Sequence, residues 1–174
     1  MLYVGRLSRE KNLDVLAAAW RRVRAHHSDA RLVVVGDGPA RGALGGDGVT
    51  LLGTLHGEAL ARVFASADVF AFPSETETFG NVVVEAAASG LPAVVVRAGA
   101  AHEHVISGVT GEIVAPGDPA AFAAAIDGLL ADPDRRTAMR RAAREHAISF
   151  DLDAAVTATW AIYRDATAVA RVAS

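Results

Sequence analysis

The stretch from Phe72 to Val96, FPSETETFGNVVVEAAASGLPAVVV, combines a strand end, a polar loop, a helix and a second strand. Its loop and helix place two carboxylates, Glu77 and Glu85, beside the unpaired N–H groups of a first helical turn. Such N–H groups suit a phosphate, and carboxylates accept hydrogen bonds from sugar hydroxyls. The stretch therefore fits a phosphorylated sugar or a nucleotide. By spacing alone, an ordinary helix capped by Thr78 fits equally well.

Length and composition exclude several classes of protein. The chain has 174 residues, enough for one domain with a real core, and a net charge of −3, which argues against nucleic acid or anionic membrane as a partner. It contains no cysteine, so disulfides, thiol nucleophiles and cysteine metal sites are excluded. The longest apolar region, 82–101, contains Glu85 and Arg97, so we expect no transmembrane segment and a soluble, cytoplasmic chain.

Short apolar runs alternate with helical patterns along the chain. The expected strands are 2–5, 31–35, 49–52, 68–72, 93–96 and 111–115. The expected helices after the first are 58–66, one opened by 79–81 and stopped by Gly90, a short one through Ile106, and 120–130, 133–147 and 153–169. A first helix is expected from about 12 to 27. The pattern predicts an α/β fold with a doubly wound parallel, Rossmann-like sheet and extra carboxyl-terminal helices. We expect residues 1–174 to form one domain whose loops converge on one edge of the sheet.

Polar residues follow the first two expected strands. Arg6 and Lys11, the only lysine, come after the first strand, at the sheet edge where ligands bind in open α/β folds. The alternative is two solvated surface cations. Gly36 and Asp37 follow the second strand, but the glycine spacing there is not that of a dinucleotide fingerprint, which excludes a nicotinamide site. These glycines instead let a turn approach a ligand or another loop.

Three acidic or histidine-rich motifs could suggest a metal, and we expect none of them to bind one. His102, Glu103 and His104 are adjacent, so they would point in different directions on a helix. Glu103 is a better candidate for binding a sugar hydroxyl. The aspartate pairs at 132–134 and 151–153 stand at helix starts, where aspartate is the expected cap.

Motifs along the whole chain recur together in one known family. They are Gly5-Arg6 with Lys11, Gly36 to Pro39, Gly53, Pro73 to Glu77, Phe79-Gly80, Glu85-Ala86, Gly90 to Pro92, Gly99, Glu103, Gly111 and Pro116 to Asp118. Their order resembles the carboxyl-terminal, donor-binding half of retaining glycosyltransferases of the two-Rossmann-domain (GT-B) type, family 4. The pair of glutamates with Phe79-Gly80 between them is the most specific element.

The resemblance implies a role for each motif residue. Arg6 and Lys11 would neutralise the diphosphate of the donor without a metal, and Glu77 would bind the transferred sugar. Glu85 would bind the ribose, and Leu55 and its neighbours would line the base. The other donor-binding residues implied are Gly5, Gly36, Asp37, Phe79, Gly80, Asn81, Val82 and Glu103. Glu75 is expected to be solvated.

The resemblance also implies substrates and partners. The donor would be a GDP- or UDP-linked hexose, and SETETFGNVV followed by ASGLP favours GDP-mannose. The acceptor would be a sugar, lipid or polysaccharide. Because the chain starts at the first strand of the donor half, we expect an amino-terminal GT-B domain in the same protein or in a separate chain. The helix at 153–169 would return toward that domain, which could also contact the inner membrane face, and the isolated chain would transfer weakly or not at all.

Two alternatives belong to other classes. One is a nucleotide-sugar-binding module that does not catalyse. The other is half of a related epimerase or phosphorylase. Phe79-Gly80 disfavours the epimerase, and a phosphorylase would need a cofactor lysine late in the chain, whereas Lys11 is the only lysine.

Overall fold

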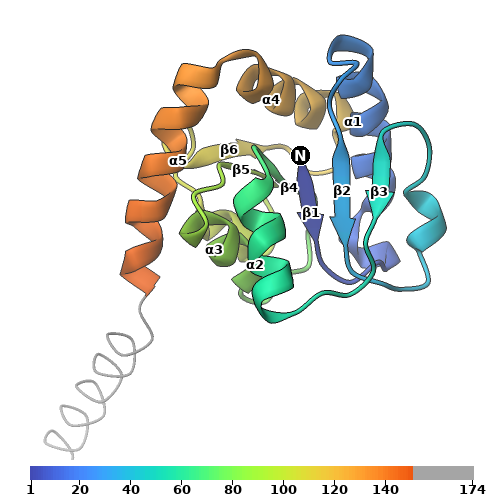
Figure 1. Ribbon diagram of the computed structural model, residues 1–174, viewed down its shortest axis with the longest axis horizontal. Helices are drawn as coiled ribbons and strands as arrows, with labels where there is room; N and C mark the ends of the chain where they lie inside the picture. The colour runs from blue at the N-terminus through green and yellow to red at the C-terminus, as the bar shows by residue number, and fades with distance from the viewer. Residues whose placement is uncertain (151–174) are drawn as a thin grey trace, which may run out of the picture.

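A computed structural model describes residues 1–150 as a six-stranded parallel sheet with helices on both faces (Figure 1). This confirms the predicted doubly wound α/β fold. The predicted helix at 153–169 and the aspartate pair at 151–153 lie outside the described residues.

The sheet has the strand order β3-β2-β1-β4-β5-β6. The strands are β1 (Leu2–Val4), β2 (Leu32–Val35), β3 (Val49–Leu51), β4 (Phe70–Phe72), β5 (Ala93–Val96) and β6 (Gly111–Val114). The three central strands β1, β4 and β5 are buried throughout, as expected of apolar strands covered on both faces. The chain builds outward from β1 to β3, then returns to the centre and builds the other way from β4. The order therefore reverses between β1 and β4, which makes their carboxyl ends the topological switch point.

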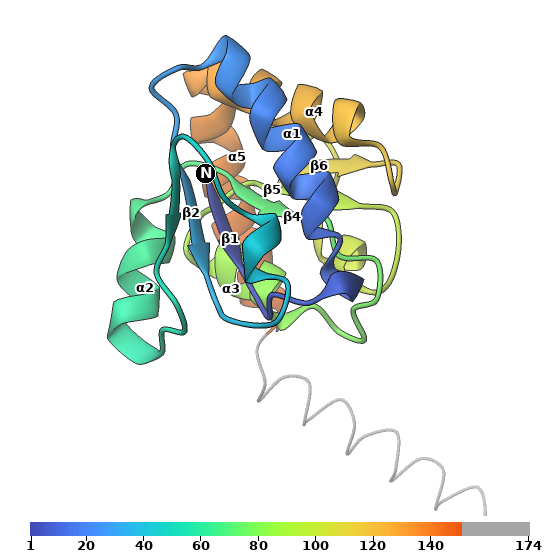
Figure 2. The same ribbon diagram turned by 90° about the vertical axis from the view of Figure 1, so that its right-hand side faces the viewer.

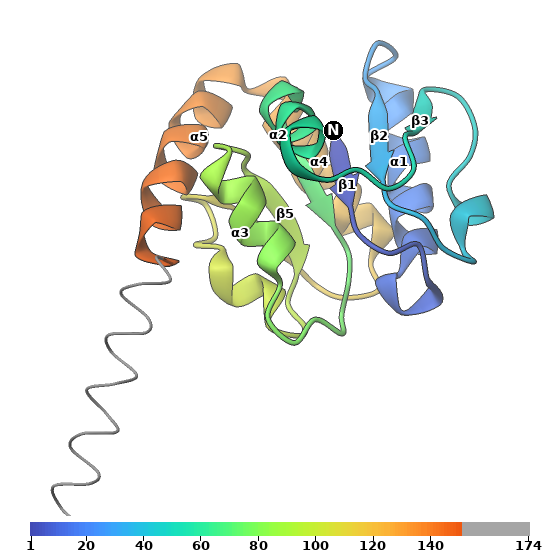
Figure 3. The same ribbon diagram turned by 60° about the horizontal axis from the view of Figure 1, so that its bottom comes forward.

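The helices form one layer on each face of the sheet. They are α1 (Leu13–His26), α2 (Gly57–Ser66), α3 (Asn81–Ala88), α4 (Pro119–Ala131) and α5 (Pro133–Ala147), with short 3-10 helices η1 (Arg9–Lys11), η2 (Arg41–Ala43), η3 (Ala101–His104) and η4 (Ile148–Phe150). Helices α1 and α4 pack together on one face, and α2, α3 and α5 lie on the other (Figure 3). No helix in residues 1–150 has both the length and the apolar character to cross a bilayer.

Local sequence signals explain where several helices begin. The carboxylate of Asp118 accepts hydrogen bonds from the N–H groups of Ala120 and Ala121, both at 2.9 Å, and caps α4. Asp132 accepts from the N–H of Arg135 at 2.8 Å and caps α5. The aspartate at 132 is therefore a helix cap, as predicted.

Two predicted element boundaries were wrong by two residues. The strand predicted at 68–72 begins at Phe70, because pairing with both neighbouring strands begins there. The short helix predicted to continue through Ile106 ends at His104. Val105 is extended, and the N–H of Ile106 donates to the hydroxyl of Thr110 at 2.8 Å, which turns the chain away from the helix.

Glycines allow the loops after β1 and β2 to touch through their backbones. Gly36 has φ of +133°, and a Cβ there would lie 1.9 Å from the carbonyl oxygen of Gly5. Gly38 has φ of +155°, and a Cβ there would lie 2.3 Å from the carbonyl oxygen of Leu7. Of the two uses that the sequence allowed for these glycines, the structure shows the approach to another loop.

Because of this close contact, we expect one added methyl group at Gly36 to lower the stability of the fold strongly. Gly36→Ala should lower the free energy of unfolding by about 3 kcal/mol or more, because the new Cβ meets rigid backbone and requires an unfavourable φ. The matched control is Gly42→Ala, where a Cβ would meet nothing within 4 Å. Urea denaturation of both variants measures the difference. Similar losses for the two variants would contradict the proposed close approach.

Candidate functional site

The loops after β1 and β4 lie side by side at the switch point (Figure 2). Lys11 Nζ forms an ion pair with Glu77 Oε1, and the two side chains are 16% and 19% exposed. The buried Ser74 donates from Oγ to the same Glu77 oxygen at 3.3 Å. The structure therefore brings together two of the three residues predicted to be catalytic.

Arg6 lies in a neighbouring cavity rather than in this ion pair. A cavity of about 290 Å³ is formed by the ends of β1 and β2 and the loop after β3. The predicted residues that line it are Gly5, Arg6, Gly36, Asp37 and Leu55. Five residues separated by up to 50 positions thus meet in one cavity at the carboxyl edge of the sheet. Thr54, which also lines this cavity, was expected only as a neighbour of Leu55.

The buried Tyr3 supports the loop that carries Arg6. Its hydroxyl donates to the carbonyl oxygen of Arg6 at 3.2 Å, and its ring stacks on Phe72 with centroids 5.9 Å apart. Burial raises the pKa of the Tyr3 hydroxyl, and the carboxylates of Glu77 and Glu10 raise it further. Tyr3 therefore stays neutral and keeps its hydrogen bond over the physiological pH range.

Helix α3 begins one loop further along the same edge. Its N-cap is Gly80, with φ of +88°, and a Cβ there would lie 2.9 Å from the Cα of Ala101. Within residues 1–150, the N–H groups of Gly80, Asn81 and Val82 donate no hydrogen bond. The alternative in which Thr78 caps this helix is therefore wrong. The first turn is available to an anion.

Two predicted carboxylates lie exposed near this turn. Glu85 is exposed in the second turn of α3, and Glu103 is exposed on η3. The exposed Phe79 packs its ring 4.8 Å from that of the buried His104, whose Nε2 is 2.5 Å from the carbonyl oxygen of Phe79. His104 is thus used to hold the loop before α3, and no potential metal-binding group of three His, Asp or Glu side chains occurs in the described part of the chain.

The expectation that Glu75 is solvated was wrong. Its Oε1 accepts a hydrogen bond from Nδ2 of Asn12 at 2.8 Å, and the side chain is partly buried. Sequence reasoning also missed Asn12, which it treated as an ordinary helix start. The contact of Asn12 with Glu75 depends on a left-handed backbone conformation, which hydrophobic periodicity does not reveal.

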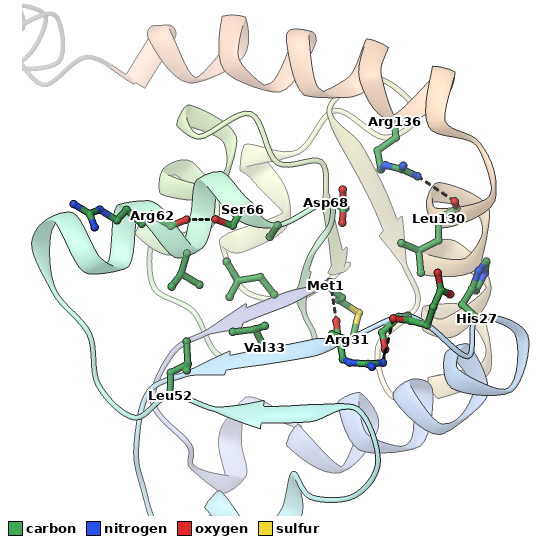
Figure 4. Close-up of a pocket in the computed structure, with 15 residues that line it drawn as sticks. Met1, His27, Arg31, Val33, Leu52, Arg62, Ser66, Asp68, Leu130 and Arg136 are labelled. Atoms are coloured by element: carbon green, nitrogen blue, oxygen red, sulfur yellow. Dashed lines mark hydrogen bonds between the residues drawn. The ribbon is translucent and has the colours of Figure 1, made fainter.

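A larger cavity, of about 580 Å³, lies at the opposite edge of the sheet (Figure 4). Met1, Arg31 and Asp68 lie around it, before the first residues of β1, β2 and β4. None of the predicted site residues lines this cavity. Because ligands of open α/β sheets bind beyond the carboxyl ends of the strands, we place the candidate site at the Lys11–Glu77 edge.

Known proteins share this fold and much of this sequence. Residues 1–132 match the family model described as glycosyl transferases group 1. The sulfoquinovosyl transferase SQD2 of Arabidopsis thaliana is 37% identical over 164 residues, which cover 90% of this chain and 31% of that protein.

Two solved structures are also similar. Sucrose-phosphate synthase from Thermosynechococcus elongatus is 33% identical with a TM-score of 0.82, over 97% of this chain and 45% of that one. Anabaena HepE, solved in complex with UDP-glucose, is 26% identical with a TM-score of 0.77, over 96% of this chain and 48% of that one. The chain spans less than half the length of each of these three proteins. The family match, the sequence identity and the GT-B type of fold agree, and the chain belongs to the group 1 glycosyltransferases.

Proposed function

We propose that this chain binds a nucleotide sugar and serves the transfer of its hexosyl group to an acceptor. The observation that carries the proposal is the Lys11–Glu77 ion pair at the switch point, between the cavity that Arg6 lines and the loop leading to α3. A diphosphate needs cations and N–H donors, and a sugar needs carboxylate acceptors. This edge of the sheet offers all three.

The transfer breaks the bond between the anomeric carbon and a diphosphate oxygen, and the diphosphate leaves with the electron pair. The anomeric carbon forms a new bond to an acceptor hydroxyl oxygen, and the proton of that hydroxyl passes to the leaving diphosphate. In the proposal, Arg6 and Lys11 stabilise this developing charge, together with the N–H groups of residues 80–82. Glu77 accepts hydrogen bonds from the transferred sugar, and Glu85 accepts them from the ribose. The cations take the role that a metal has in other sites, so we propose a metal-independent reaction, with retention as in the family that the motifs resemble.

Two considerations bear on the base and sugar of the donor. The motif after Pro73 favours GDP-mannose, whereas the Anabaena protein was solved with UDP-glucose. The base would enter the cavity that Leu55 lines. We propose a UDP- or GDP-linked hexose, and a titration decides between them.

The acceptor and a second domain complete the proposal. The chain spans 31% to 48% of the three similar proteins. We propose that an amino-terminal domain, in the same protein or in a separate chain, closes over the donor, excludes water and supplies the site for a sugar or lipid acceptor. Without that domain, donor binding should persist and transfer should be weak.

Calorimetric titration tests the proposed function. We expect UDP or GDP, with ADP as the comparison, to bind the 174-residue chain in the absence of metal, and the matching nucleotide sugar to bind as well. Adding magnesium should change the affinity little, because Arg6 and Lys11 already supply positive charge. Absence of binding by both UDP and GDP and by their sugar conjugates would contradict the proposal.

Lys11→Ala tests the diphosphate role. We expect the variant to lose about tenfold or more in affinity for the nucleoside diphosphate, the scale of a lost charged hydrogen bond, with little change for the nucleoside. Equal losses for both ligands would show that Lys11 does not act through the diphosphate.

Glu85→Ala tests the ribose role. The variant should weaken nucleoside binding by about 1–3 kcal/mol, because the hydroxyls lose a charged acceptor. Asp134→Ala is the control, since Asp134 is also exposed on a helix but lies in the first turn of α5, near Arg136, which lines the cavity at the opposite edge of the sheet. An unchanged affinity in Glu85→Ala would remove Glu85 from the site.

A further inference from the structure

Asn12 has an unusual backbone conformation next to Lys11. Its φ of 50° and ψ of 45° lie in the left-handed region, and it is the only non-glycine residue with positive φ in residues 1–150. Asparagine tolerates this region better than other side chains do, but the region is still unfavourable relative to a right-handed turn. The fold retains this conformation at the junction of η1 and α1.

The side chain of Asn12 does not act as a helix cap. Asparagine at an N-cap ordinarily accepts a hydrogen bond from the first turn, yet no such bond forms here. Its Nδ2 instead donates across to the loop after β4, to the carbonyl oxygen of Pro73 at 3.3 Å and to Glu75 Oε1 at 2.8 Å. The left-handed turn thus directs the amide toward the other loop.

Asn12 completes a set of contacts between two short segments. Thr76 Oγ1 donates to the carbonyl oxygen of Glu10 at 3.3 Å, and Lys11 pairs with Glu77. Residues 10–12 therefore meet residues 75–77 along their whole length. Asn12 is joined to its partner loop at two points, a main-chain oxygen and a carboxylate.

The charges in these two segments show what the Asn12 contact affects, namely which carboxylate pairs with Lys11. Lys11 has two carboxylates in the facing segment, Glu75 and Glu77, and pairs with only Glu77. The amide of Asn12 donates a hydrogen bond to the carboxylate of Glu75. If this amide were absent, Glu75 would be free to compete for the ammonium and to repel an incoming anion.

We propose that Asn12 is a positioning residue, which holds Glu75 away from Lys11 and so keeps the Lys11–Glu77 pair in place for a diphosphate. The arrangement of the pair follows from the contacts above. Only the purpose, binding of a diphosphate, rests on the proposed function. The two parts can therefore be tested separately.

The single lysine of the chain makes the first test specific. Lysine labelled with ¹³C at Cε gives one NMR signal, that of Lys11, and Glu77→Gln supplies the reference for a broken pair. In Asn12→Gly we expect this signal to move from its wild-type position, because Glu75 then competes with Glu77 for the ammonium, although glycine adopts the left-handed turn without strain. Adding Glu75→Gln should restore the wild-type signal, because the competing charge is gone.

The outcomes separate positioning from a structural role. An unchanged signal in Asn12→Gly would overturn the proposal, as would a changed signal that Glu75→Gln fails to restore. Asp134→Asn, which neutralises an exposed carboxylate in the first turn of α5, should leave the signal unchanged. If Asn12→Gly fails to fold, Asn12→Ala also removes the NH₂ donor without adding a charge, and its signal should move as well.

The second test measures whether Asn12 contributes to binding of a diphosphate. Asn12→Gly should raise the dissociation constant for UDP or GDP, whichever binds the wild type, by about tenfold, with little change for the nucleoside. An equal affinity for the diphosphate in wild type and variant would overturn the link to binding. A wild type that binds neither nucleotide would overturn the proposed function, while the NMR result would still decide the positioning.

Discussion

The ion pair between Lys11 and Glu77 joins the two halves of the sheet at the point where the strand order reverses. A cation kept for an anionic ligand needs compensation when the ligand is absent, because an unpaired, partly buried charge is costly. Glu77 gives that compensation through one oxygen, which Ser74 also contacts. An ammonium has three donors, so Lys11 can keep Glu77 and still bind phosphate oxygens. The pair can thus remain when the proposed donor is bound.

Much of the fold could be predicted because its signals are local. The strand at 93–96 and the helix at 133–147 have the predicted limits, since the first is a short apolar run and the second begins with aspartate and proline. The start of β4 at Phe70 is a boundary that such local signals do not determine. Whether a strand begins at 68 or 70 depends on pairing with β1 and β5, which are distant in sequence. Boundaries set by neighbours are not visible in a local pattern.

The candidate site also has a part that could be predicted from the sequence and a part that could not. Arg6, Lys11 and Glu77 could be placed at the same edge of the sheet, because parallel strands bring their carboxyl ends to one edge. The contact between Asn12 and Glu75 could not, because it depends on a left-handed residue and on the register of two loops. Nothing in the sequence shows that Glu75, two positions before Glu77, has a hydrogen-bond partner rather than being solvated. Composition and topology locate the charges, and loop geometry decides which of them pair.

Close approach of backbones gives this edge its rigidity. Gly36 lies against Gly5, Gly80 against Ala101, and a Cβ on Gly99 would lie 2.9 Å from the carbonyl oxygen of Glu75. Main chain packed on main chain leaves few rotamers to reorganise, so the charged groups are held before a ligand arrives. Glycine at these positions therefore acts on the site without touching a ligand. The same preorganisation explains why Asn12, a residue with an unfavourable backbone conformation, can be retained there: the contacts on both sides of it offset that cost.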